Sequence, residues 1–328
     1  MKKLILLLVL ASLISFSVGL TLGKKSKSEI TNNIVMPCPE KYRYINTLLG
    51  CNEKTVLKKY EYVQFSKDLE NYLNEEAKAH HIVKSSVFFR DLKSGPTFSI
   101  NAQEDFIPAS LLKVPLLISY LSLIEKDPSL LKQSTKYNAV IGAVTQELNG
   151  IEQLEQNKLY TIEELIDRMI IYSDNLAYGL LIKFLERNYP TQSVHEQTMK
   201  DLGLVNPVDV SQNIATVKGY ASIFRQLYAS SYLSPTMSEK ALALLAHTNF
   251  DKGLVAGLPE GIQVAHKFGQ REGLKDNLKQ FHDCGIVYYP DNPYLLCVMT
   301  VGNDKNQLIE EIKSISMKVY EEVNSRRL

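Results

Sequence analysis

The chain has 328 residues, enough for one large domain or two modest ones with a core that needs no disulfide to close it. Its 37 lysines and arginines nearly balance its 36 aspartates and glutamates, and 45% of its residues are hydrophobic, which is typical of a soluble globular protein. A nucleic-acid-binding surface normally shows as a basic excess, so this balance argues against nucleic acid as a partner.

Residues 1–23 are the first element, with Met1–Lys3 before an uncharged apolar run from Leu4 to Gly23. A cleaved signal peptide has an apolar region of roughly 7–15 residues before small residues, and Ser17–Gly19 would suit cleavage. About 20 apolar residues can span a bilayer, so the length favours an uncleaved anchor. Both interpretations place the rest of the chain outside the cytoplasm, with membrane contact through this segment alone. A buried N-terminal core helix is the least favoured alternative.

Residues 24–60 are mostly polar and are predicted to form a stalk or linker that contains Cys38 and Cys51. Outside the cytoplasm a disulfide between these two cysteines is permitted and would close a small loop. Cys284 and Cys297 lie on two apolar runs and are either cross-strand neighbours or buried free thiols. No C-x-x-C spacing occurs, so we expect neither a metal nor a cofactor.

Residues 61–328 are predicted to form one domain of mixed α+β class. The expected elements are a helix over 63–80, strands over 85–90 and 96–100, helices to about residue 245 with a capping box at 161–164, strands over 261–269, 283–289 and 294–302, and a last helix over 308–323. Strands at both ends of the domain indicate one antiparallel five-stranded sheet, covered by the N- and C-terminal helices. The middle block would form an all-helical lobe, with the site between the two parts.

The strongest candidate for chemistry is a buried helix that begins near Pro108 and is hydrophobic nearly all round. Ser110 and Lys113 are three residues apart, so they share one face of this helix. A buried lysine must pair or lose its proton, and a neutral amine beside a serine hydroxyl can act as the base for a nucleophile. The alternative is that Ser110 only caps the helix while Lys113 extends to solvent.

A second group, Ser173–Asp174–Asn175, lies between two apolar helices. Ser173 could pass a proton to a leaving group, and Asn175 could donate an amide hydrogen bond to a substrate carbonyl. Asp174 is expected to hold the turn together. The alternative is a plain helix-capping turn.

A third group lies on an apolar strand, where Lys267 would be a second cation that attracts a substrate carboxylate and depresses the pKa of Lys113. Gly269 would let backbone come close. The next amide, the N–H of Gln270, could then form half of an oxyanion hole with that of Ser110.

In this order and spacing the three groups resemble the class A β-lactamases and related penicillin-recognising serine enzymes, whose motifs are S-x-x-K, S-D-N and K-T-G. The resemblance covers roughly residues 65 to 323 and includes the first hairpin, 89–95, and the helix pair 161–182. It implies that Ser110 is acylated, that Lys113 is the base and that Ser173 is the proton shuttle. It also implies that Asn175 and Lys267 bind substrate, while Ser110 and Gln270 supply the oxyanion-hole amides.

The sequence departs from this family at two places. Class A β-lactamases deacylate with a glutamate on the loop after S-D-N, and no glutamate occurs between Leu202 and Asn213. Asp209 is the acid in that loop, four residues before Asn213, and is the candidate deacylation base. Phe268 stands where the family has a hydroxyl that helps hold the substrate carboxylate. It would either point away from Lys267 or narrow the cleft.

These features predict a serine acyl-enzyme outside the cytoplasm, acting on β-lactams or related acyl-D-Ala peptides, with a small molecule or peptidoglycan peptide as partner. One alternative is a DD-peptidase or transpeptidase on peptidoglycan. The other is a degenerate domain that binds cell-wall peptide without turnover. The sequence leaves the oligomeric state open.

Overall fold

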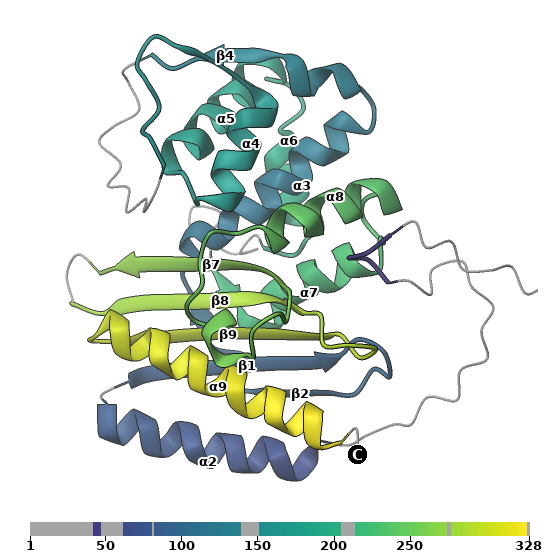
Figure 1. Ribbon diagram of the computed structural model, residues 1–328. Coiled ribbons are helices and arrows are strands. Elements are labelled where there is room, and N and C mark those ends of the chain that lie inside the picture. Colours follow the sequence, from purple (N-terminus) through teal and green to yellow (C-terminus); the bar gives the residue numbers. More distant parts are fainter. Residues whose placement is uncertain are drawn as a thin grey trace, which may run out of the picture. The chain divides into compact units, whose positions relative to one another are not determined.

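An antiparallel sheet of five strands in the order β2-β1-β9-β8-β7 forms the centre of the domain (Figure 1). The strands are β1 (Ile82–Asp91), β2 (Thr97–Ile100), β7 (Val264–Glu272), β8 (Lys279–Val287) and β9 (Tyr294–Gly302). Every residue of β9 is buried, because this central strand is covered on both faces. The five-stranded sheet predicted from the sequence is therefore confirmed.

The computed structural model describes residues 42–46, 62–80, 82–138, 151–204, 214–273 and 277–326. All of these belong to one compact unit, which comprises residues 39–49 and 54–328. The predicted membrane segment 1–23, most of the predicted stalk, and both Cys38 and Cys51 lie outside the described residues. Within the described ranges, no helix combines the length and the apolar character needed to cross a bilayer.

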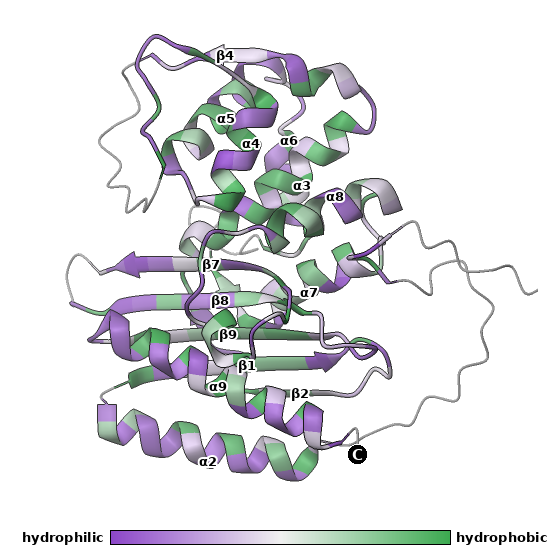
Figure 2. Ribbon diagram, in the orientation of Figure 1, coloured by the Kyte–Doolittle hydropathy of each residue, from purple (hydrophilic) through white to green (hydrophobic). Residues whose placement is uncertain are grey.

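One face of the sheet is covered by α2 (Val63–His80) and α9 (Lys305–Ser325), as the sequence predicted. Helix α2 buries Leu69 and Leu73 at a four-residue spacing, which places both side chains on one face. Helix α9 does the same with its apolar positions, which include Leu308, Ile312, Ile315, Val319 and Val323. Figure 2 shows hydrophobic residues along β9, whereas hydrophilic residues are interspersed along α2 and α9.

The other face of the sheet meets the helical part of the chain. Its elements are β3 (Asp105–Phe106), η1 (Ala109–Leu112), α3 (Lys113–Ile124), η2 (Pro128–Lys132), β4 (Ser134–Lys136), β5 (Leu159–Thr161), α4 (Ile162–Ile171), α5 (Asn175–Asn188), α6 (Val194–Asp201), β6 (Ala215–Thr216), α7 (Val217–Tyr228) and α8 (Pro235–Ala246). The short helix η3 (Val255–Gly257) packs on α9 instead. The sequence placed the whole middle block in a separate lobe. Instead α7 packs on β9, β8 and β1, because the strands are apolar on this face as well and need a cover.

The starts of α4 and β8 differ in how well the local sequence predicts them. Thr161 and Glu164 form the predicted capping box, with the Glu164 carboxylate accepting from the Thr161 N–H at 2.7 Å. Strand β8 begins at Lys279 rather than at 283, because 279–282 pair with 269–272 of β7. The position of this strand end depends on pairing with β7, and the sequence of β8 alone does not indicate that pairing.

Residues 42–46, inside the range predicted as a stalk, pack on the domain. The Glu239 carboxylate of α8 accepts backbone N–H groups of Arg43, Tyr44 and Ile45 at 2.6–3.0 Å. Ile45 is buried, and the Tyr288 hydroxyl donates to the Tyr44 carbonyl at 2.9 Å. This part of the chain is therefore fixed to α8 and to the end of the sheet.

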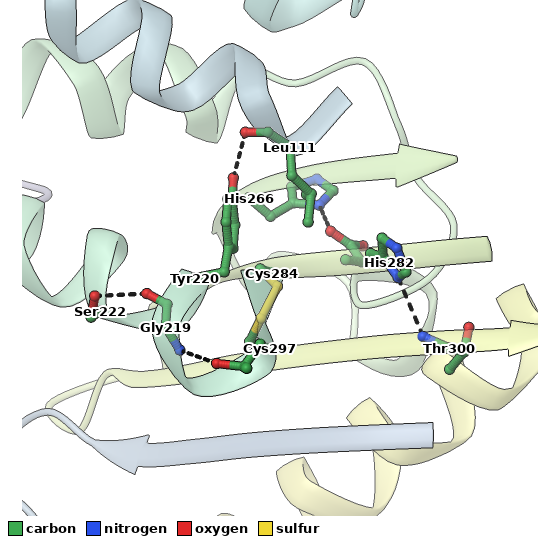
Figure 3. The surroundings of a disulfide bond; sticks show 11 residues. Leu111, Gly219, Tyr220, Ser222, His266, His282, Cys284, Cys297 and Thr300 are labelled. Carbon is green, nitrogen blue, oxygen red and sulfur yellow. Dashed lines mark hydrogen bonds and ion pairs between the residues drawn. A yellow bond between two sulfur atoms is a disulfide. The ribbon is translucent and has the colours of Figure 1, made fainter. Parts of the chain in front are cut away.

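Cys284 and Cys297 form a disulfide between directly opposed positions of β8 and β9 (Figure 3). Of the two alternatives that the sequence left open, the structure supports the cross-strand pair. Both residues are fully buried and belong to the core on the α7 side of the sheet. Lys267 is the register partner of Cys284, so the disulfide lies in the same row of the sheet as this lysine.

A variant with Cys284→Ala and Cys297→Ala should lose about 3 kcal/mol of unfolding free energy, because a loop of 13 residues is no longer closed in the unfolded chain. Denaturant unfolding of the oxidised wild type and the variant measures this. Reduction should destabilise the wild type by a similar amount and leave the variant unchanged. Equal stability of oxidised wild type and variant would contradict the prediction.

Glu311 of α9 is a buried carboxyl between α9, α2 and β1. The Tyr72 hydroxyl approaches its Oε2 at 3.4 Å, and among the described residues its Oε1 accepts no hydrogen bond. Burial, with a smaller contribution from Glu76, raises the pKa of Glu311 from 4.5 to about 7. The folded domain therefore favours the protonated form of this side chain.

Stability should fall as pH rises from about 4.5 to 7, since the unfolded chain releases this proton before the folded one does. Glu311→Gln should then raise the unfolding free energy by roughly 2 kcal/mol at pH 8 and change it little at pH 4.5. Calorimetric melting at both pH values tests this, with the exposed neighbour Glu310→Gln as the control. An equal effect of Glu311→Gln at both pH values would count against it.

Candidate active site

Ser110 lies in η1, and Lys113 is the first residue of α3, which continues directly from η1. In a 3-10 helix the side chains at i and i+3 are aligned, so this turn places both residues along one line. Lys113 Nζ lies 3.0 Å from Ser110 Oγ. Ala109, directly before the serine, has φ of 51°, a left-handed conformation that is costly for a residue with a Cβ.

Lys113 is 2% exposed, so the alternative in which its side chain extends to solvent is wrong. The reason is that 11 of the 12 residues of α3 are buried. Its Nζ donates to the Ser173 carbonyl at 2.5 Å and approaches Ser173 Oγ at 3.0 Å and Asn175 Oδ1 at 2.6 Å. The structure thus brings four oxygen atoms of three predicted site residues, Ser110, Ser173 and Asn175, around one amine.

The Ser173–Asn175 turn joins α4 to α5 and is held by Asp174. The Asp174 carboxylate accepts from the N–H groups of Leu176 and Ala177 at 2.8 and 3.0 Å and from Arg168 Nε at 2.9 Å. Asp174 therefore caps α5, as the sequence predicted. Ser173 has φ of 57°, and this left-handed residue turns the chain so that its carbonyl and hydroxyl both face Lys113. The turn is a helix cap and part of the site at once.

Lys267 enters the same cluster from β7 and is 0% exposed. Its Nζ lies 2.9 Å from Ser173 Oγ and donates to the Phe268 carbonyl at 3.1 Å. Ser173 Oγ therefore lies between the two lysine amines. Asn175 is the first residue of α5, and its amide oxygen is engaged with Lys113 rather than turned wholly toward a substrate.

Burial lowers the pKa of Lys113 from 10.5 to about 7, while the charge of Asp174 opposes this shift. From the sequence we expected burial to remove the proton and Lys267 to lower the pKa further, and burial is the larger cause. Burial and then repulsion by Lys113 lower the pKa of Lys267, and Asp283 opposes it. Because this repulsion acts both ways, the cluster disfavours two protonated amines and suits a neutral Lys113.

Gly269 is where β7 comes closest to η1. A Cβ built on Gly269 would lie 2.6 Å from the Pro108 carbonyl and 3.0 Å from Leu111 Cγ. The absence of a side chain is therefore required for this approach. It brings β7 close to the turn that carries Ser110, and the pairing of the Ser110 and Gln270 amides in an oxyanion hole stays a prediction.

Phe268 points to the face of the sheet opposite to the disulfide and stacks on Phe250, with ring centroids 4.2 Å apart. The sequence left open whether it would point away from Lys267 or narrow the cleft. Strand β7 is an edge strand. Side chains that point to opposite faces of the sheet can therefore reach around this edge and meet there. The Phe268 ring centroid lies 4.0 Å from Lys267 Nζ, a cation–π contact where a hydroxyl was expected.

The candidate deacylation base Asp209 and the nearby Asn213 lie outside the described residues, so the role of Asp209 stays a prediction. One buried pair was missed by the sequence reasoning. His266 Nδ1 lies 2.8 Å from Asp283 Oδ1, and Asp283 Oδ2 accepts from the Leu254 N–H at 3.1 Å. The two residues are on adjacent strands and 17 positions apart, so the pairing of β7 with β8 was needed to find them.

Within the described part of the chain, no group of three or more histidine, cysteine, aspartate or glutamate side chains is placed to hold a metal ion. The site consists of a serine, two buried lysines, a second serine and an amide. Such a set can activate a hydroxyl, carry a proton and stabilise a developing oxyanion.

Comparisons with known proteins identify the family of the chain. A model of the β-lactamase enzyme family matches residues 65–323. No curated protein matches the chain.

Solved structures share the fold at low sequence identity. PBP-A is 21% identical with a TM-score of 0.67, over 83% of this chain and 100% of the other. A mutant of PBP-A, solved as an acyl-enzyme complex with penicillin G, gives the same identity and TM-score over 82% of this chain and 100% of that one. A class A β-lactamase from Mycobacterium abscessus is 22% identical with a TM-score of 0.66, over 78% and 99% of the two chains. With the family model matching most of its length, the chain belongs to the β-lactamase enzyme family.

Proposed function

We propose that this protein is a serine acyl-enzyme in which Ser110 attacks the carbonyl of a β-lactam or a related acyl-D-Ala peptide. The observation that carries the proposal is the position of Lys113 Nζ, 3.0 Å from both Ser110 Oγ and Ser173 Oγ in a buried cluster. A base must lie within hydrogen-bond reach of the proton that it takes, and its pKa should be near the working pH. Lys113 meets both conditions, with a pKa of about 7.

In the acylation step, neutral Lys113 accepts the Ser110 hydroxyl proton while Oγ bonds to the substrate carbonyl carbon. The N–H groups of Ser110 and Gln270 stabilise the oxyanion that forms. The carbon–nitrogen bond of the substrate then breaks, and the leaving nitrogen takes the Ser173 hydroxyl proton. Ser173 recovers a proton from protonated Lys113, which lies 3.0 Å away. Lys113 is thereby returned to its neutral form.

Lys267 is suited to the recognition of a substrate carboxylate. Its amine contacts Ser173 Oγ at 2.9 Å, so an anion bound beside it would favour its protonated form and lie next to the proton relay. Phe268 supplies an aromatic face there instead of a hydroxyl. We infer that the carboxylate is held mainly by charge, with one hydrogen bond fewer than in relatives that carry threonine or serine at this position.

The fate of the acyl group separates the candidate activities. Fast hydrolysis of a β-lactam acyl-enzyme requires a base that activates water, and Asp209 is the proposed residue. A peptidase or transpeptidase instead takes its acyl group from a wall peptide, and a transpeptidase passes it to an acceptor other than water. PBP-A shares the fold, and its mutant was captured as an acyl-enzyme with penicillin G. We favour β-lactam acylation with deacylation as the slow step. The apolar N-terminal segment supports a location outside the cytoplasm, where peptidoglycan peptides occur.

Labelling with a fluorescent penicillin tests the proposal. Wild type should form a covalent adduct that survives denaturing electrophoresis, and Ser110→Ala should form none, because the attacking oxygen is absent. Ser122→Ala, on the solvent side of α3, is the matched control and should label normally. Failure of the wild type to label would sink the proposal in favour of a binding domain, and rapid loss of label with nitrocefin turnover would identify a hydrolase.

The acylation rate should depend on pH through Lys113. Since the base acts in its neutral form, the rate constant should rise with pH and level off above an apparent pKa near 7. Lys113→Arg stays protonated and should lower the rate by about 10²–10⁴-fold. Stopped-flow acylation from pH 5 to 9 measures this. A flat profile in the wild type would remove Lys113 as the base.

A further inference from the structure

A groove on the domain lies between α7 and strands β1 and β2. Helix α7 packs on β9, β8 and β1, which leaves β2 at the edge of the sheet beyond it. The groove has a volume of about 610 Å³, within the range of small-molecule sites. Its lining residues are Phe88, Arg90, Thr97, Phe98, Ser99, Gln103, Thr216, Lys218, Gly219, Ala221, Ser222, Arg225 and Leu295.

The groove is strongly cationic. Arg90 comes from β1, while Lys218 and Arg225 come from α7, and no acidic residue is among the side chains that line it. Within the described ranges, none of these three side chains makes an ion pair or a hydrogen bond. The chain as a whole carries a formal charge of only +1, so three cations without a carboxylate partner among the described residues are a local concentration of charge at this groove.

The rest of the lining completes a binding site rather than a bare charged patch. The hydroxyls of Thr97, Ser99 and Ser222 and the amide of Gln103 can hydrogen-bond to a ligand, and the partly exposed ring of Phe88 offers an apolar surface. Arg90 is partly exposed and lines the groove. Its planar guanidinium can therefore make paired hydrogen bonds to a carboxylate or phosphate.

We propose that this groove binds a small ligand that carries at least two anionic groups, carboxylate or phosphate. It is separate from the serine site, because Lys267 is on β7 and the groove is at β2, the opposite edge of the five-stranded sheet. The inference does not depend on the reaction proposed for Ser110.

Titration calorimetry with inorganic pyrophosphate and with citrate tests this, at constant ionic strength and with lactose as a neutral comparison. At least one anion should bind saturably at one site per chain, more weakly as salt rises, while lactose binds far less. Binding of pyrophosphate alone assigns a phosphate ligand, and binding of citrate alone assigns a carboxylate. Absence of saturable binding by both anions at millimolar concentration would overturn the proposal.

The variant pair Lys218→Gln and Arg225→Gln removes two exposed cations from α7 and should weaken binding about tenfold or more, because charge-assisted hydrogen bonds are lost. Lys126→Gln with Lys132→Gln is the matched control, since it removes two exposed charges from outside the groove. Melting curves check that both variants fold. Unchanged affinity in the groove variant, or an equal loss in the control, would refute the assignment. Arg225→Glu, a charge reversal at an exposed position, provides a second test with the same expected loss.

Discussion

The burial of one lysine amine organises the functional part of this protein. Lys113 Nζ is enclosed by oxygens of three residues, Ser110 one turn before it and both Ser173 and Asn175 at the junction of α4 and α5. An amine removed from water loses solvation, and the charge of Asp174 offsets only part of that loss, so the pKa of Lys113 falls to about 7. The same burial that would destabilise a charged lysine thus produces a base suited to neutral pH.

The surrounding structure holds this cluster from several directions. Asp174 fixes the turn by capping α5 and by pairing with Arg168, and it is 0% exposed. The Tyr220 hydroxyl of α7 donates to the Leu111 carbonyl at 2.9 Å, which ties the turn after Ser110 to the helix on the sheet (Figure 3). Strand β7 approaches the same turn at Gly269. Two left-handed residues, Ala109 and Ser173, are tolerated at the centre of these contacts because the packed elements determine their conformation.

In the reaction proposed for Ser110, the geometry of the lysine cluster bears on the acylation half. The residues that set the site apart are Phe268, whose ring meets Lys267, and the absence of glutamate from the loop after the Ser173 turn. An aromatic ring beside a buried amine offers its π-face but cannot hydrogen-bond a carboxylate. These differences bear on how substrate is held and how the acyl group leaves, rather than on how Ser110 is activated.

The sequence by itself determined the class of fold, the strand and helix content, the capping box at Thr161 and the grouping of Ser110, Lys113, Ser173 and Lys267 as one site. It could do so because periodicity and capping are local, and because three spaced motifs resembled one family. Only the tertiary structure decided that Cys284 bonds to Cys297, that α7 covers the sheet and that His266 pairs with Asp283. Each of these depends on strand register or on the packing of segments far apart in the chain, which no local pattern encodes.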